Sequence, residues 1–214
     1  MSESVPNRCR LVLIAPSGSD DAAPVDMALA GGDVASIILP RGERSDEAYQ
    51  SFVDKVTPLA QGRGVAVIVE GDARVAMRAK ADGLHFEGSK ADLADMVERH
   101  GGKIMVGTGG VKTRDDALEL GETQPDYMFF GRFGYDGKPD AHPRNLSLGE
   151  WWGEMVAVPC IVMAGSSDES VLAVAETGVD FVAVEKAVFA EGDAGNRVAA
   201  LNALLDEKAP RFED

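Results

Sequence analysis

The stretch CIVMAGSSDESVLAVAETGVDFVAV, residues 160–184, holds a complete unit of strand, turn, helix and strand. Its two ends, Cys160–Met163 and Phe181–Val184, are short apolar runs of the kind that form buried strands. Between them, Ser167–Glu176 has helical periodicity and begins with polar residues that cap helices. Strands that alternate with helices are typical of a parallel sheet covered by helices. We therefore expect an α/β fold.

The same unit recurs along the chain. Eight apolar runs can be counted, and each is followed by a polar turn and a stretch with helical periodicity. In most of them the apolar residues stand at consecutive positions, as expected for parallel strands covered on both faces. The runs are Leu11–Ala15, Ala35–Leu39, Val65–Val69, Gly83–Phe86, Lys103–Val106, Tyr127–Phe130, Cys160–Met163 and Phe181–Val184.

Two architectures give this alternation, an open doubly wound sheet and a closed barrel. Eight strands in 214 residues favour the barrel, so we expect a single (β/α)8 TIM barrel domain over residues 1–214. In such barrels the chemistry lies at the carboxyl ends of the strands, so the residues just after each run are the first candidates for a site. The segment 131–143, rich in Gly, Pro and charge, is the best candidate for a long loop over that face.

The chain is strongly acidic, with 36 Asp and Glu against 21 Lys and Arg and a net charge of −15. This charge disfavours nucleic acid or an anionic membrane as a partner, so a bound anion needs a local group of donors. No stretch resembles a signal peptide or a membrane span, and Cys9 and Cys160 lack the spacing of metal ligands. We expect a cytoplasmic protein with two buried thiols that binds a small phosphorylated metabolite. Homo-oligomer formation stays open.

The turn after the seventh run is the first candidate for phosphate binding. At Gly165 and Ser166 a strand leads into a helix, and such a turn points backbone N–H groups at an anion. An ordinary turn needs small residues as well, but the loops after strands seven and eight often form the phosphate site of these barrels. Lys186, after the eighth run, could neutralise the phosphate or pair with an acid such as Glu185.

Two further turns carry candidate ligands. Gly109 and Gly110, after the fifth run, are candidate phosphate-binding residues because they let a backbone approach a ligand closely, although a flexible turn explains them nearly as well. Asp72, after the third run, could hold Mg²⁺ together with Glu70 and Glu87, because Mg²⁺ prefers carboxylates and phosphate oxygens. The competing role for Asp72 is that of a helix N-cap.

Several segments, taken in order, resemble the thiamine phosphate synthase family and its tautomerase relative TenI. Ala81-Asp-Gly-Leu-His is similar to the family's Ala-Asp-Gly-Val-His, and Asp126-Tyr-Met-Phe-Phe-Gly is similar to its sixth strand. Lys138 lies near the lysine of the family's Thr-x-Thr-Lys loop. Pro159–Gly165 and the segment that starts at Gly178 resemble its last two strands.

This resemblance implies an enzyme that joins a hydroxymethylpyrimidine diphosphate to a thiazole phosphate and releases pyrophosphate with the help of Mg²⁺. Carried over by position, Asp72 would be a Mg²⁺ ligand and Lys138 would contact the diphosphate. Gly165, Ser166 and the region of Lys186 would hold the thiazole phosphate.

The chain departs from the family pattern at three places. The family's Gln-x-Arg-x-Lys is here Ser36-Ile-Ile-Leu-Pro-Arg, which leaves Arg41 as the candidate catalytic cation. In the family's Gly-Gln-x-Asp the aspartate, a second Mg²⁺ ligand, falls on Lys90. The Gly-Gly of the phosphate loop is Ala164-Gly165.

Three hypotheses remain. The chain is an enzyme of the thiamine phosphate synthase type, or a diverged paralog that binds a phosphorylated metabolite without this chemistry. The third is another phosphate-handling barrel, such as an epimerase or isomerase, which would need His85, Asp72 and Lys112 to converge. Lys112 also stands near the position of the tautomerase's histidine, and a lysine needs a lowered pKa for that acid–base role.

Overall fold

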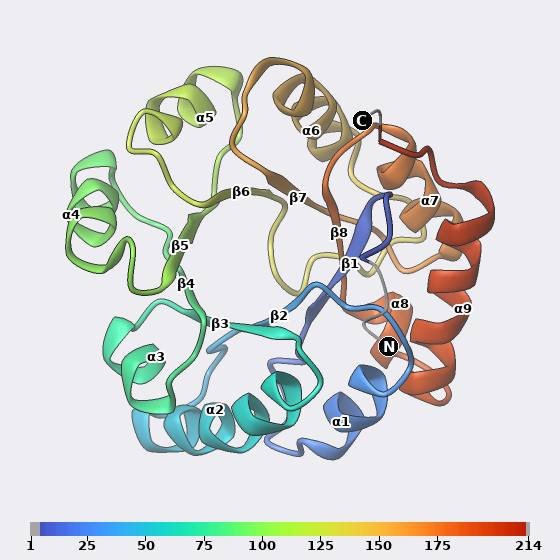
Figure 1. Ribbon diagram of the computed structural model, residues 1–214, viewed down its shortest axis with the longest axis horizontal. Helices are drawn as coiled ribbons and strands as arrows, with labels where there is room; N and C mark the ends of the chain where they lie inside the picture. Colours follow the sequence, from blue (N-terminus) through green and yellow to red (C-terminus); the bar gives the residue numbers. More distant parts are fainter. Residues whose placement is uncertain (1–4, 213–214) are drawn as a thin grey trace.

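The computed structural model describes residues 5–212. Eight parallel strands, arranged in sequence order, close into one barrel in which β1 pairs with both β2 and β8. Figure 1 shows the helices arranged around the outside of this ring. The predicted (β/α)8 barrel is confirmed, and the open doubly wound sheet is excluded because that fold leaves two edge strands unpaired.

Each strand is followed by a helix, and an additional short helix precedes the last one. The strands are β1 Arg10–Ile14, β2 Ser36–Leu39, β3 Ala66–Glu70, β4 Gly83–His85, β5 Met105–Thr108, β6 Tyr127–Phe130, β7 Cys160–Met163 and β8 Phe181–Val184. The helices are α1 Ala23–Leu29, α2 Asp46–Gln61, α3 Ala73–Ala79, α4 Lys90–His100, α5 Arg114–Gly121, α6 Pro143–Met155, α7 Asp168–Glu176, α8 Lys186–Phe189 and α9 Ala194–Lys208.

The strand boundaries differ most from the prediction at β5. The apolar run predicted Lys103–Val106, whereas the strand covers Met105–Thr108. Gly107 explains the difference, because a Cβ atom at this position would lie 2.0 Å from the ring of Tyr127. The strand therefore continues through a glycine that leaves room for a large neighbouring side chain, and apolarity alone did not reveal this.

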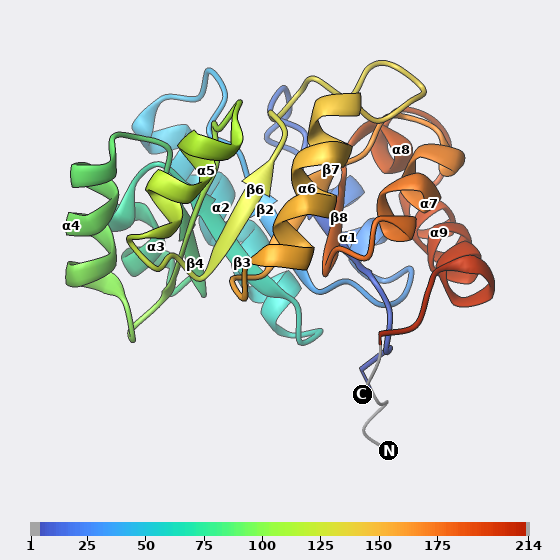
Figure 2. The same ribbon diagram turned by 90° about the horizontal axis from the view of Figure 1, so that it is seen from above.

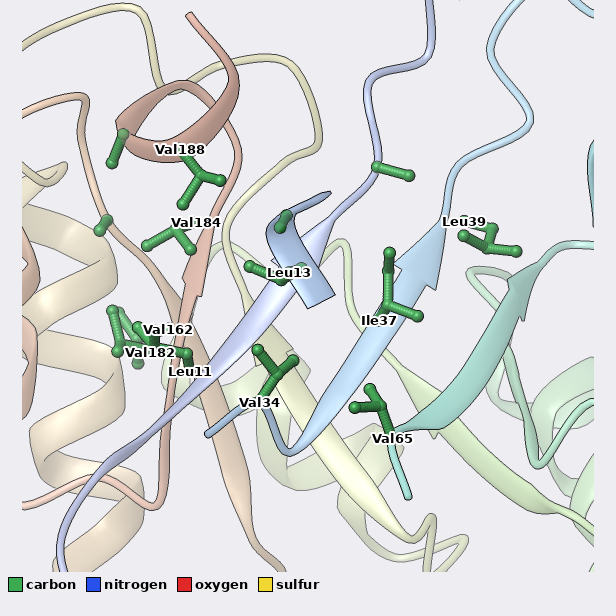
Figure 3. Close-up of a cluster of buried hydrophobic side chains, with 14 of the residues drawn as sticks. Leu11, Leu13, Val34, Ile37, Leu39, Val65, Val162, Val182, Val184 and Val188 are labelled. Carbon is green, nitrogen blue, oxygen red and sulfur yellow. The ribbon is translucent and has the colours of Figure 1, made fainter. Parts of the chain in front are cut away.

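Two buried layers make up the core. Alternate residues of each strand face opposite sides, so one set fills the barrel interior and the other packs under the helices. The interior set includes Val12, Ile14, Ile38, Phe129 and Met163. Figure 3 shows part of the outer set, with Leu11, Leu13, Ile37, Leu39, Val182 and Val184 on neighbouring strands. A filled interior means that ligands bind at the end of the barrel rather than within it.

The two cysteines lie in this core. Cys9 and Cys160 are both buried and free, as predicted. Burial raises the pKa of the Cys160 thiol to about 12, so the sulfur stays protonated and unreactive. Among residues 5–212, no helix is both long and apolar enough to cross a bilayer.

Candidate functional site

The carboxyl ends of the eight strands meet at one face of the barrel, which we call the mouth. Figure 2 shows the mouth at the top, with the first (blue) and last (dark red) described parts of the chain at the opposite face. Inward-facing residues alternate along each strand, so Glu70 of β3, two positions beyond the interior residue Ile68, is directed to the mouth. The turns after the strands bring the other candidate residues to this face.

The turns after β7 and β8 are brought together, as predicted for a phosphate site. Ser166 and Lys186 line one open cleft of about 550 Å³, and Arg197 at the start of α9 lines it as well. Arg197 forms an ion pair with Asp168 of α7. It also donates to the carbonyl of Ala187, with 3.0 Å between Nε and the oxygen. The cleft thus places two cationic side chains beside a turn of small residues.

The loop of residues 131–142, between β6 and α6, reaches across the mouth to these turns. The carbonyl of Lys138 accepts the N–H of Ser166 at 2.8 Å, and that of Pro139 accepts the N–H of Ser167 at 3.2 Å. The Lys138 side chain is exposed, so this predicted catalytic residue meets the phosphate turn through its backbone. Gly165, the other predicted residue of this turn, donates its N–H to Ser170 Oγ at 3.0 Å.

Asp136 of the same loop is a charged residue with only 2% of its surface exposed. Its Oδ2 accepts the N–H of Lys186 at 2.7 Å. Its Oδ1 is also buried and has no hydrogen-bond partner among the described residues. The loop therefore carries a half-satisfied carboxylate to the turn after β8, which is unusual because buried charges are normally fully paired.

Glu185, the first residue after β8, is close to this carboxylate. Its Oε2 accepts the N–H of Gly134 at 3.2 Å. Burial, with the charge of Asp136 as a second cause, raises the pKa of Glu185 to about 7. The mouth thus contains a carboxyl group that changes charge near neutral pH.

The turn at Gly109 and Gly110 faces a carboxylate as well. A Cβ atom at Gly109 would lie 3.1 Å from Oε1 of Glu87, and one at Gly110 would lie 3.0 Å from its Oε2. Gly110 has a φ of +78°, a conformation that favours glycine. The glycines were predicted to admit a ligand, and the group that approaches them here is the Glu87 side chain.

A buried histidine connects this turn to the barrel interior. His85 is fully buried, with Nδ1 2.8 Å from the Tyr127 hydroxyl and Nε2 3.4 Å from Oε1 of Glu87. A neutral ring that carries its proton on Nε2 satisfies both contacts. Phe129 and Phe133 pack against it, with ring centroids 5.6 and 5.0 Å away. His85 is therefore a hydrogen-bonded histidine of the barrel interior.

Asp72 lies at the mouth but does not form a carboxylate site for Mg²⁺. It is the N-cap of α3, where Oδ1 accepts the N–H of Arg74 at 2.8 Å and Oδ2 pairs with the Arg74 guanidinium at 3.0 Å. Lys90, at the place of the family's second carboxylate, is paired with Glu122. No group of three or more His, Cys, Asp or Glu residues within 5–212 is arranged to hold a metal. The residues do not fit the ion as they lie.

Arg41 is also engaged locally. Its guanidinium pairs with Asp46, the first residue of α2, and its backbone N–H donates to Oε2 of Glu70 at 2.7 Å. Lys112 is exposed in the turn after β5. The predicted cations of the mouth are thus distributed around its rim.

Sequence reasoning missed Asp136 and Arg197 and gave Glu185 only the role of a partner for Lys186. The alternation along β8 could have identified Glu185, because it continues the every-second-residue series of the interior residues Phe181 and Ala183. Asp136 lies in a loop without periodicity, so no sequence signal separates it from a solvated acid. The position of Arg197 depends on how α8 turns the chain before α9.

Comparisons with known proteins agree with this architecture. A profile of the family described as thiamine monophosphate synthase matches residues 11–188. The thiamine-phosphate synthase of Rhodospirillum centenum is 34% identical over 183 residues, which cover 82% of this chain and 87% of that protein. That of Hyphomonas neptunium is 29% identical over 212 residues, with 94% and 96% covered.

A solved structure supports the fold. The thiamine phosphate pyrophosphorylase of Pyrococcus furiosus matches 94% of this chain and 97% of its own with a TM-score of 0.78, at 21% sequence identity. The family match extends from β1 into α8 and includes Ser166 and Lys186 of the cleft, whereas Arg197 lies beyond it. On this evidence the chain belongs to the thiamine monophosphate synthase family.

Proposed function

We propose that this chain binds a phosphate monoester of the thiazole phosphate type in the cleft beside the turns after β7 and β8. The observation that carries the proposal is the lining of that cleft by Ser166, Lys186 and Arg197. In a protein with a net charge of −15, Lys186 and Arg197 bring positive charge to this cleft, which Glu191 also lines and where Arg197 is paired with Asp168.

The relatives' names suggest what is done with the ligand, namely the formation of thiamine phosphate. In that reaction the thiazole nitrogen attacks the methylene carbon of a hydroxymethylpyrimidine diphosphate. A C–N bond forms, the C–O bond to the diphosphate breaks, and pyrophosphate leaves with the electron pair. No proton has to be transferred, so the protein's task is to hold the two rings in line and to stabilise the leaving charge.

Lys138 and Arg41 are the side chains proposed to stabilise the leaving diphosphate. Lys138 is exposed on the loop that crosses the mouth. Arg41 would have to leave Asp46, and an exposed ion pair of this kind stabilises by only about 0–1 kcal/mol. Both cations are therefore available at small energetic cost.

A second candidate function is the binding of a phosphorylated metabolite without turnover. One observation favours it: Asp72 is committed to the cap of α3 and to Arg74, and Lys90 stands where the family has a carboxylate. A barrel without this metal site would keep the phosphate cleft and lose the electrostatic stabilisation of the leaving group.

One experiment separates the two candidates. Purified protein is assayed for thiamine phosphate formation with both family substrates and Mg²⁺, and the affinity for each substrate alone is measured by calorimetry. Turnover supports the first function, and binding of the thiazole phosphate without turnover supports the second.

The cleft itself is tested by a matched pair of lysine variants. Lys186→Ala should weaken binding of the thiazole phosphate about tenfold, since it removes one charge-assisted contact. Lys208→Ala, at the exposed end of α9, removes the same charge away from the cleft and should leave binding unchanged. Equal affinities for the two variants would show that the phosphate binds elsewhere.

A further inference from the structure

The loop of residues 131–142 has two sets of contacts with the turns that line the phosphate cleft. In the first set, the N–H groups of Ser166 and Ser167 donate to the carbonyls of Lys138 and Pro139. The hydroxyl of Ser167 donates to the Pro139 carbonyl as well, at 3.0 Å. The backbone donors that would make this turn an anion site are therefore already in use.

The contact is a close approach of two backbones. A Cβ atom at Gly165 would lie 2.3 Å from the carbonyl oxygen of Pro139 and 2.6 Å from the carbonyl carbon of Asp140. The missing side chain at Gly165, which we predicted to admit a phosphate, admits the protein's own loop. Figure 1 shows the yellow segment after β6 crossing the ring toward α7 and α8, and in Figure 2 it lies above the strand ends.

The second set of contacts places a negative charge at the turn after β8. Oδ2 of Asp136 accepts the N–H of Lys186, as an oxygen of a bound phosphate would. The Lys186 ammonium lies against the same loop, 3.2 Å from where a Cβ atom of Gly137 would stand. Oδ1 of Asp136 is buried, and no group within residues 5–212 donates a hydrogen bond to it.

We propose that the loop of residues 131–142 is an internal competitor for the phosphate cleft. Asp136 and the carbonyls of Lys138 and Pro139 occupy the N–H groups that a phosphate monoester would use, and the ligand binds these groups only when it displaces the loop. This inference rests on the proposed phosphate site and adds a means of regulation to it. The exchange of partners is feasible because each N–H group gives up one acceptor and gains another.

The orphaned Oδ1 atom indicates why the loop can be displaced. A carboxylate that has lost its water on both oxygens and regained a donor on one is held less firmly than a fully paired one. On release it regains water on both oxygens. A phosphate offers the N–H groups more charge and more oxygens than the aspartate does, so it should win the competition when present in excess.

The first test compares two aspartates of the same loop, with inorganic phosphate as the probe. Asp136→Ala removes the competing carboxylate and leaves the two competing carbonyls, and it should tighten phosphate binding about tenfold. Asp140→Ala removes the same charge from an exposed position on the loop and should change the affinity less than about twofold. If Asp136→Ala destabilises the fold, Asp136→Asn keeps the side-chain shape and should give a smaller change in the same direction.

The second test distinguishes displacement from a simple effect of charge. The N–H of Gly134 is held by Glu185 only while the loop is closed, so saturating phosphate should accelerate its hydrogen exchange about tenfold in the wild type. Binding with unchanged exchange at Gly134, or equal affinities in both alanine variants, would overturn the competitor while the phosphate site stands. Phosphate that binds neither the wild type nor Asp136→Ala would overturn the phosphate site as well.

Discussion

Arg8 and Asp136 are both charged and both almost completely buried, at opposite ends of the barrel. Arg8 precedes β1 at the face away from the mouth and is 1% exposed, and Asp136 at the mouth is 2% exposed. The Arg8 guanidinium donates to Asp206 at 2.7 Å, to the Cys9 carbonyl at 2.9 Å and to Asn202 at 3.0 Å. Asp136 has one acceptor atom paired and one unpaired.

The difference separates two uses of a buried charge. A charge whose nitrogen atoms each have an acceptor, as in Arg8, holds one structure in place, because any rearrangement leaves groups unpaired. A buried charge with an unpaired oxygen makes the folded position of its segment less stable. Less free energy is then needed to displace that segment. We therefore expect the contacts at the face away from the mouth to stabilise the fold. At the mouth, we expect the loop of residues 131–142 to be displaced more easily.

The largest effect is expected at Arg8. Arg8→Met keeps much of the apolar volume but leaves Asn202 and the Cys9 carbonyl without their donor, so unfolding should become easier by about 2–4 kcal/mol. Urea unfolding measures this change. Arg211→Met removes an exposed arginine from the same region and should cost less than about 1 kcal/mol. Similar losses in the two variants would mean that burial of Arg8 adds nothing.

The second prediction uses the pKa of Glu185, which burial raises from 4.5 to about 7. The unfolded chain loses the Glu185 proton near pH 4.5, whereas the folded protein keeps it up to about pH 7. The contribution of Glu185 to the free energy of unfolding is therefore fully present below pH 4.5 and is lost as the pH rises to about 7. Glu185→Gln removes the loss. Relative to the wild type, its free energy of unfolding should rise by about 1–2 kcal/mol between pH 4.5 and pH 8, with solvent screening allowed for.

Thermal unfolding at a series of pH values tests this. A difference between wild type and Glu185→Gln that stays constant across pH 4.5–8 would contradict the raised pKa. Repeating the series in Asp136→Asn sharpens the comparison, because removal of the neighbouring charge should move the transition of Glu185 to lower pH.

A third prediction concerns Asp72, a carboxylate that is paired near the surface. Asp72→Ala removes the N-cap of α3 and should cost about 1 kcal/mol, whereas Asp72→Asn keeps a capping oxygen and should cost less. Added Mg²⁺ should shift the melting temperature of the wild type and of Asp72→Ala equally. A shift confined to the wild type would restore Asp72 as a metal ligand.

The smallest effect is expected at Asp136, although it is as buried as Arg8. Asp136→Asn retains an acceptor for the Lys186 N–H and removes a charge whose Oδ1 lacks a partner. The free energy of unfolding should change by about 0.5 kcal/mol or less, measured by urea unfolding at pH 8. A loss comparable to that of Arg8→Met would erase the distinction between the two ends.

The barrel could be predicted from the sequence because its signals are local. Runs such as Cys160–Met163 are apolar at every position since both faces are covered, and Ser167 caps α7 as its residue type suggests. The alternation of inward-facing and outward-facing residues along the strands is also a local signal, and it predicts which residues at the strand ends face the mouth.

The contacts of the loop of residues 131–142 could not be predicted in this way. The role of Lys138 in the closed loop lies in its carbonyl group, which every residue type possesses, so its identity says nothing about the contact. Asp136 meets Lys186, 50 positions away, through one backbone N–H. Such pairings depend on the path of an aperiodic loop, which no periodic pattern encodes.

The antiparallel bridge between Arg8 and Arg211 joins the first and last parts of the barrel next to β1 and β8, which are themselves paired. Two positions that are far apart in the sequence, Arg8 and Arg211, are therefore side by side in the fold. A circularly permuted protein, with a short linker across the bridge and new ends opened at the exposed Gly101–Gly102 turn, would keep every strand neighbour. In such a protein β1 to β4 would be synthesised last, so the order of synthesis could be changed without changing the mouth.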